Sequence, residues 1–128
     1  MPREYFAKHV SFALRAAFAA CIVLLVALSW LPAPMMTRTD IGGFAEHFTA
    51  YLGTAIIMGL AYRERPRLFV QFVLLVALAA ILEVGQLYSP GRHSSVLDFA
   101  ASTSGVAFGG LLMWSGRLCW RIRMPGAP

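Results

Sequence analysis

The chain has 128 residues, of which 59% are hydrophobic and only 13% are charged. A soluble domain carries about 25% charged residues, so this composition excludes an ordinary soluble globular protein and indicates an integral membrane protein. The net charge of +5 does not indicate nucleic-acid binding, because most arginines flank long apolar runs and no stripe of basic and aromatic residues is present.

Apolar segments predict the architecture. A helix needs about 20 residues to cross a bilayer, and four segments come close to this length when their margins are included. They cover residues 10–31, 44–62, 68–87 and 96–116. The sequence therefore predicts one all-α domain over the whole chain, an integral membrane bundle of four transmembrane helices joined by short loops.

The first segment has a second interpretation, a cleaved secretory signal peptide. A basic start, an apolar run and the small residues around Ala27 fit this alternative. However, the apolar run is long for a signal peptide, and the bulky Trp30 is typical of an interfacial anchor. We therefore expect the segment to be retained.

The distribution of lysine and arginine predicts the orientation. The N-terminal flank through Arg15, the turn at 63–67 and the C-terminal flank each hold three such residues, whereas the loops at 32–43 and 88–95 hold one each. Positive charge marks the cytoplasmic side of a membrane protein. We therefore expect both termini in the cytoplasm and the two less basic loops outside.

Polar residues mark the outer end of the third and fourth segments. Glu83 and Gln86 share a helical face near the end of the third segment, and Ser-Pro-Gly at 89–91 interrupts the chain after them. Polar and small residues then follow at helical spacing in the fourth segment. They are Asp98, Ser102, Gly105 and Gly109.

The second segment brings further polar residues to the same end. His47 begins it next to Glu46, and Tyr51 lies one helical turn later on the face of His47. Arg92 and His93 belong to the outer loop. Ionisable groups are costly in hydrocarbon, so their convergence on one membrane face predicts an extracytoplasmic polar site.

These motifs resemble the VanZ-like family of small bacterial membrane proteins. The resemblance rests on Glu83-x-x-Gln86, Pro90, Arg92-x-x-Ser95-x-x-Asp98, Gly105 and Gly109. Asp40 and His47-Phe48-x-x-Tyr51 are similar to the family's first motif. The resemblance implies a multi-pass protein of the bacterial inner membrane. It also implies a link to the cell envelope, because the founding member is associated with teicoplanin resistance, but it implies no reaction.

Recognition of a head group is the first functional hypothesis. The ligand would be a membrane lipid, a lipid-linked envelope precursor or a lipoglycopeptide, and Arg92 would bind its phosphate or carboxylate through two parallel hydrogen bonds. The candidate ligand-binding residues are His47, Tyr51, Glu83, Gln86, Arg92, Ser95, Asp98 and Ser102.

Other classes of function remain open. In a structural or assembly protein, Glu83 and Asp98 would pair with Arg92 to hold the helices together, and Gly105-x-x-x-Gly109 would serve close helix packing. In an enzyme acting on an envelope lipid, Glu83 or Asp98 would be the base and His47 its proton partner. A transporter built from so few helices would require a homo-oligomer. We expect no cofactor, and no residues have a diagnostic metal-ligand spacing.

Overall fold

The computed structural model describes residues 2–35, 42–63 and 68–123, with side chains described for 5–35, 42–63, 68–117 and 119. These residues form α1 (Pro2–Trp30), α2 (Gly43–Ala61), α3 (Leu68–Gly85) and α4 (Val96–Arg123), with 3-10 turns at Ala33–Met35 and Gln86–Tyr88. No strand occurs within these described ranges, so the predicted all-helical class is confirmed there.

Three helices in the described part of the chain are long and apolar enough to cross a membrane. They are α1, α3 and α4. The chain therefore has helices typical of a membrane protein. In α2, polar residues interrupt the apolar sequence, and Tyr51 and Thr54 are both only 3% exposed. Neighbouring helices thus cover these two polar side chains of α2, and its crossing of the membrane stays a prediction.

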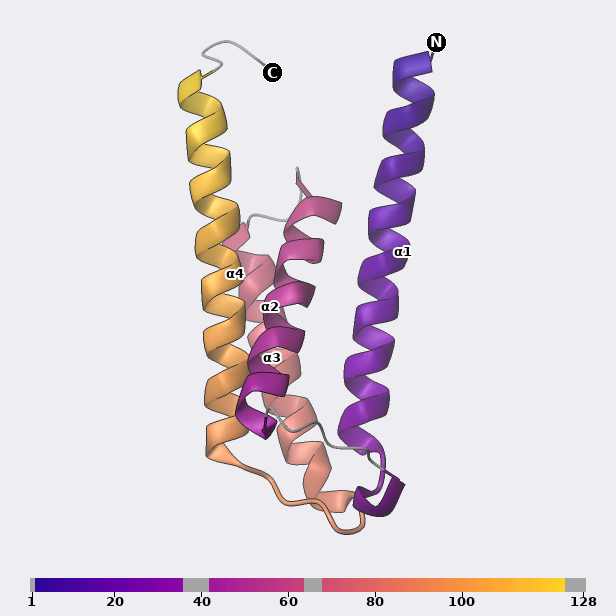
Figure 1. Cartoon of the computed structure of the whole chain (residues 1–128), viewed down its shortest axis with the longest axis vertical. Helices are drawn as coiled ribbons and strands as arrows, with labels where there is room; N and C mark the ends of the chain where they lie inside the picture. The colour runs from indigo at the N-terminus through magenta and orange to yellow at the C-terminus, as the bar shows by residue number, and fades with distance from the viewer. Residues whose placement is uncertain (1, 36–41, 64–67, 124–128) are drawn as a thin grey trace.

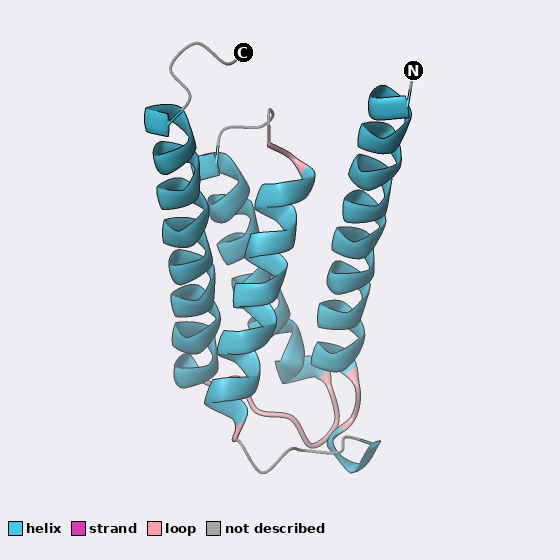
Figure 2. Cartoon of the chain, turned by 45° about the horizontal axis from the view of Figure 1, so that its top comes forward, coloured by secondary structure: helices cyan, strands magenta, loops and turns pink. Residues whose placement is uncertain are grey.

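The helices run up and down, so that the start of α1 and the end of α4 lie at the same end of the molecule (Figure 1). We call this the terminal end. The opposite end, called the loop end, carries residues 31–35 and 86–95 (Figure 2). The polar residues of the predicted site belong to the loop end.

Glycines allow α2 and α4 to approach closely, and these two helices form the most extensive pair. A Cβ atom added to Gly105 would overlap the carbonyl oxygen of Phe48 and lie 3.0 Å from the amide nitrogen of Leu52. One added to Gly109 would lie 2.8 Å from Cβ of Ala55. The two glycines expected to serve helix packing thus lie at this contact, where backbone meets backbone.

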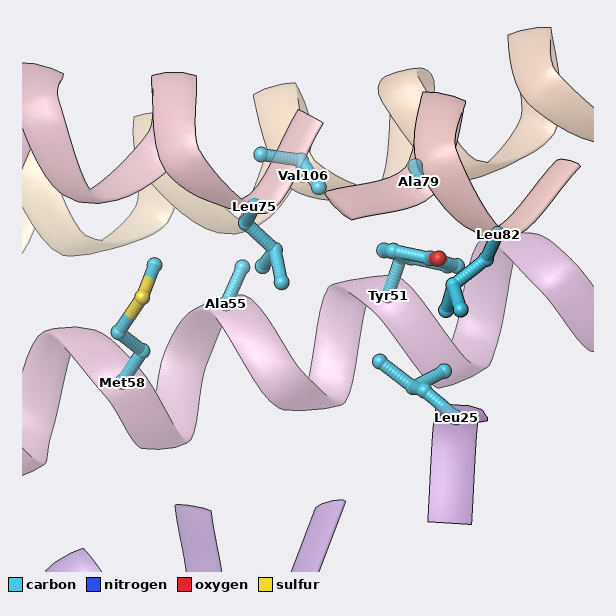
Figure 3. Close-up of a cluster of buried hydrophobic side chains, with 8 residues drawn as sticks. All are labelled: Leu25, Tyr51, Ala55, Met58, Leu75, Ala79, Leu82 and Val106. Carbon is cyan, nitrogen blue, oxygen red and sulfur yellow. The ribbon is translucent and has the colours of Figure 1, made fainter. Parts of the chain in front are cut away.

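The core lies between all four helices (Figure 3). Tyr51, Ala55 and Met58 from α2 face Leu75, Ala79 and Leu82 from α3, with Leu25 from α1 and Val106 from α4 completing the cluster. Because α2 supplies buried residues at spacings of three and four, one face of α2 is packed from Tyr51 to Ala61. This packing fixes which residues of α2 reach the loop end.

Contacts at the loop end hold α1 against the bundle. The Ser89 hydroxyl donates a hydrogen bond to the carbonyl oxygen of Trp30 at 3.0 Å, and the Ala33 amide donates to the carbonyl oxygen of Pro90 at 3.3 Å. The Trp30 indole also lies against Gly85, where an added Cβ would meet Nε1 at 2.7 Å. The end of α1 is therefore tied to the turn between α3 and α4.

Replacing Ser89 with Ala is expected to lower the free energy of unfolding in detergent by about 1 kcal/mol, because the Trp30 carbonyl loses its side-chain donor. Ser104→Ala is the matched control, since Ser104 is exposed on α4, and its change should stay within about 0.5 kcal/mol. Reversible unfolding in mixed micelles measures both. Equal stability of Ser89→Ala and wild type would show that this hydrogen bond does not hold α1.

Candidate functional site

A cavity of about 230 Å³ opens at the loop end. The start of α2, the turn after α3, the following loop and the first turn of α4 contribute its walls. Its lining residues are Gly43, Glu46, His47, Gln86, Gly91, Arg92, His93, Ser95 and Asp98. Five of the predicted ligand-binding residues are among them, namely His47, Gln86, Arg92, Ser95 and Asp98.

A tight turn carries Arg92 to the cavity. The Arg92 amide donates a hydrogen bond to the carbonyl oxygen of Ser89 at 3.1 Å, with Pro90 and Gly91 between them. Gly91 has a φ of +73°, which glycine adopts without steric cost. Proline followed by a glycine with positive φ is typical of a type II turn. The turn formed by Ser-Pro-Gly thus positions the backbone of Arg92 beside the cavity.

Glu83 connects α3 to the start of α4. The side chain of Ser95 caps α4, because its Oγ accepts a hydrogen bond from the Asp98 amide at 3.3 Å. The Ser95 amide in turn donates to Oε1 of Glu83, which is only 7% exposed. Glu83 therefore satisfies a backbone donor at the first turn of α4, and it does not line the 230 Å³ cavity.

His47 on α2 contacts two residues of α4 that lie one turn apart. Its Nδ1 is 3.3 Å from Oγ of Ser102, and its Nε2 is 4.0 Å from Oδ2 of Asp98. The Ser102 hydroxyl donates its own hydrogen to the carbonyl oxygen of Asp98 at 2.9 Å. Both ring nitrogens of His47 thus face polar atoms of α4.

The cavity combines charges of both signs. Arg92 and His93 supply donors, whereas Glu46 and Asp98 supply carboxylate acceptors. His47 beside Asp98 can accept or release a proton. Such a set suits a ligand that carries an anionic group next to hydroxyl or amino groups. Among the described side chains, no group of three or more His, Cys, Asp or Glu is placed to hold a metal ion.

Other predicted site residues lie apart from the cavity. Tyr51 belongs to the core, and it lines a smaller space of about 100 Å³ that shares Glu46, His47 and Arg92 with the cavity. Ser102 is buried and contacts the site through His47 and Asp98. Asp40 lies outside the described residues.

Four lining residues were not among the predicted ligand-binding residues. They are Gly43, Glu46, Gly91 and His93. Glu46 and His93 belong to the polar residues whose convergence predicted the site, although neither was assigned to the ligand. The two glycines have no side chain that could mark them, since they line the cavity with backbone.

No protein-family model matches this chain, and neither a curated protein nor a solved structure matches it.

Proposed function

We propose that the chain is a VanZ-like protein of the bacterial cytoplasmic membrane, whose cavity binds the head group of a membrane lipid or of a lipid-linked envelope precursor. The observation that carries this proposal is the composition of the 230 Å³ cavity. Its walls include His47, Gln86, Arg92, Ser95 and Asp98, the residues whose spacing resembles the family motifs.

In this proposal all four helices cross the membrane, and the cavity faces the outside. The excess of lysine and arginine at the terminal end supports the orientation. The length of α2 supports its crossing, because 19 residues extend over about 28 Å, close to the hydrocarbon thickness of about 30 Å. The cavity would then lie level with the lipid head groups.

The size of the cavity supports binding of part of a larger molecule. Pockets that enclose a whole small ligand have volumes of about 300–1,000 Å³, and this cavity of about 230 Å³ is smaller. The adjoining 100 Å³ space is lined by Leu25 and Leu28 of α1 as well as by polar residues. A head group in the cavity could thus continue into an apolar chain that leaves between α1 and α2.

The chemistry of the walls supports an anionic head group. Arg92 is half-buried in the cavity, where its planar guanidinium can donate two parallel hydrogen bonds to a phosphate or carboxylate. Gln86 is only 2% exposed and offers both a donor and an acceptor. The carboxylates of Glu46 and Asp98 can accept hydrogen bonds from sugar hydroxyls or an amine.

Native mass spectrometry of protein purified gently from its own membranes tests the proposal. Wild type is expected to retain a lipid or a lipid-linked sugar, and Arg92→Lys is expected to retain it roughly tenfold less, because a lysine cannot form the two-pronged contact. Arg117→Lys is the control, because Arg117 lies at the other end of α4, donates to the carbonyl oxygen of Gly59 and can be replaced there by another donor. Equal retention by wild type and Arg92→Lys would contradict the proposal.

A structural or assembly role is the alternative, and the contacts of Glu83 and His47 favour it. Glu83 connects α3 to Ser95 at the start of α4. His47 connects α2 to Ser102 and Asp98 of α4. If the polar cluster serves only to hold helices together, Asp98→Asn should lower the stability in detergent, and no ligand should be retained by wild type.

An enzyme acting on an envelope lipid is a second alternative. It is favoured by the His47 and Asp98 side chains, which lie 4.0 Å apart on the cavity wall. This alternative predicts that cells expressing Asp98→Asn accumulate a lipid that wild-type cells consume. Identical lipid compositions in the two strains would exclude it.

A further inference from the structure

A second, larger groove lies between α1 and the α2–α3 pair, toward the terminal end. Figures 1 and 2 show α1 continuing past the end of α2 in this direction, while α3 lies farther from α1 there than at the loop end. One cavity of about 630 Å³ is lined by residues between Phe6 and Arg15 of α1 and by the end of α2. A second cavity of about 300 Å³ lies nearer the core, between α1, α2 and α3, and Tyr62 lines both cavities. Each volume is within the range of small-molecule pockets.

The two ends of this groove differ in chemistry. Arg15 and Arg63 line the wider cavity, and Cζ of Arg15 lies 5.6 Å from the ring centroid of Tyr62, above the ring. Within the described side chains, no carboxylate forms a salt bridge with either arginine. The narrower cavity is apolar, and its walls include Phe18, Ile22 and Leu78.

The level of the two arginines matches a membrane boundary. From Arg15 to Trp30, α1 rises about 22 Å, and α2 rises about 28 Å before Arg63 follows it. Both side chains therefore lie near the edge of a hydrocarbon layer about 30 Å thick, whereas the apolar cavity lies inside it. A cation pair at the edge and an apolar cavity below it complement a phosphate with its attached acyl chain.

We infer that this groove binds one anionic glycerophospholipid, with its phosphate at Arg15 and Arg63 and one acyl chain between Phe18, Ile22 and Leu78. The ring of Tyr62 holds the Arg15 guanidinium at the groove, and Phe18 packs edge-on against Tyr62 at 5.6 Å between ring centroids. The lipid thereby covers the face of α2 and α3 that α1 leaves open. This inference does not depend on the head-group site, which lies at the opposite end.

The test is lipid retention after reconstitution into an equimolar mixture of phosphatidylglycerol and phosphatidylcholine, followed by native mass spectrometry. Wild type is expected to retain one phosphatidylglycerol in preference to phosphatidylcholine. The double variant Arg15→Gln/Arg63→Gln is expected to lose this preference roughly tenfold or more, since each basic residue near a membrane surface contributes about fivefold to the affinity for anionic lipid. Lys8→Gln removes a charge from α1 that does not line the groove, so it should reduce the preference by no more than about fivefold, the general contribution of one basic residue near the membrane.

A second variant examines the acyl-chain half of the groove. Leu78→Trp fills the apolar cavity without changing any charge, and it should also abolish preferential retention while the helical content stays unchanged. Retention of both lipids in equal amounts by wild type would overturn the inference, since it would mean that only the ordinary lipid shell surrounds the protein. Retention unaffected by both the arginine pair and Leu78→Trp would overturn it as well.

Discussion

Replacing Gly105 with Ala is expected to lower the free energy of unfolding by about 3 kcal/mol. The added methyl group would overlap the backbone carbonyl of Phe48, and backbone cannot move aside as a flexible side chain can. The α2–α4 contact would have to separate, although it is the most extensive in the bundle. Denaturant titration in mixed micelles measures the loss.

The control for this prediction is the same substitution at a glycine that faces open space. Gly53 lies on α2, and no atom lies within 4 Å of its added Cβ. Gly53→Ala should therefore leave the stability unchanged or raise it by up to about 1 kcal/mol, because alanine favours helix over glycine. Equal losses of stability at Gly53 and Gly105 would show that the loss does not come from steric overlap at the α2–α4 contact.

Replacing Glu83 with Ala is expected to cost about 2–3 kcal/mol. The Ser95 amide at the start of α4 would lose its acceptor in a partly buried place, and an unsatisfied donor costs about 1–3 kcal/mol. Glu83→Gln keeps a side-chain oxygen of the same reach, so it should restore most of the stability. The same micelle titration compares the three proteins.

The comparison of these two variants separates structure from function at Glu83. If Gln restores stability and also ligand retention, Glu83 acts only through its hydrogen bond to Ser95. If Glu83→Gln lowers the stability as much as Glu83→Ala does, the hydrogen bond from the Ser95 amide does not account for the loss.

The four helices could be predicted because each follows a run of apolar residues. Their ends were less predictable: α1 begins at Pro2 instead of near residue 10, and α4 continues to Arg123 instead of ending near 116. Both extensions consist largely of residues outside the apolar runs, including several charged ones. Hydropathy locates the part of a helix that lies in lipid, whereas hydrogen bonding continues past it.

The candidate site was predictable in position and less so in its members. Arg92 and Asp98 could be assigned to one membrane face because they stand at segment ends. The sequence did not reveal that Glu83 turns toward the Ser95 amide while Gln86, three residues later, lines the cavity. That division depends on how α3 is rotated against α4, which is set by packing between helices and not by spacing along one of them.

The pairing of α2 with α4 has a consequence for the way the chain is completed during synthesis. His47 meets its partner Ser102 across 55 positions of sequence, and the glycines that receive α2 follow shortly after. At about 5–20 residues per second, a ribosome needs roughly 3–11 seconds to add this length. During that interval only α1 and α3 can cover the polar residues of α2. The α2–α4 contact, and with it the complete bundle, can form only after α4 has been synthesised.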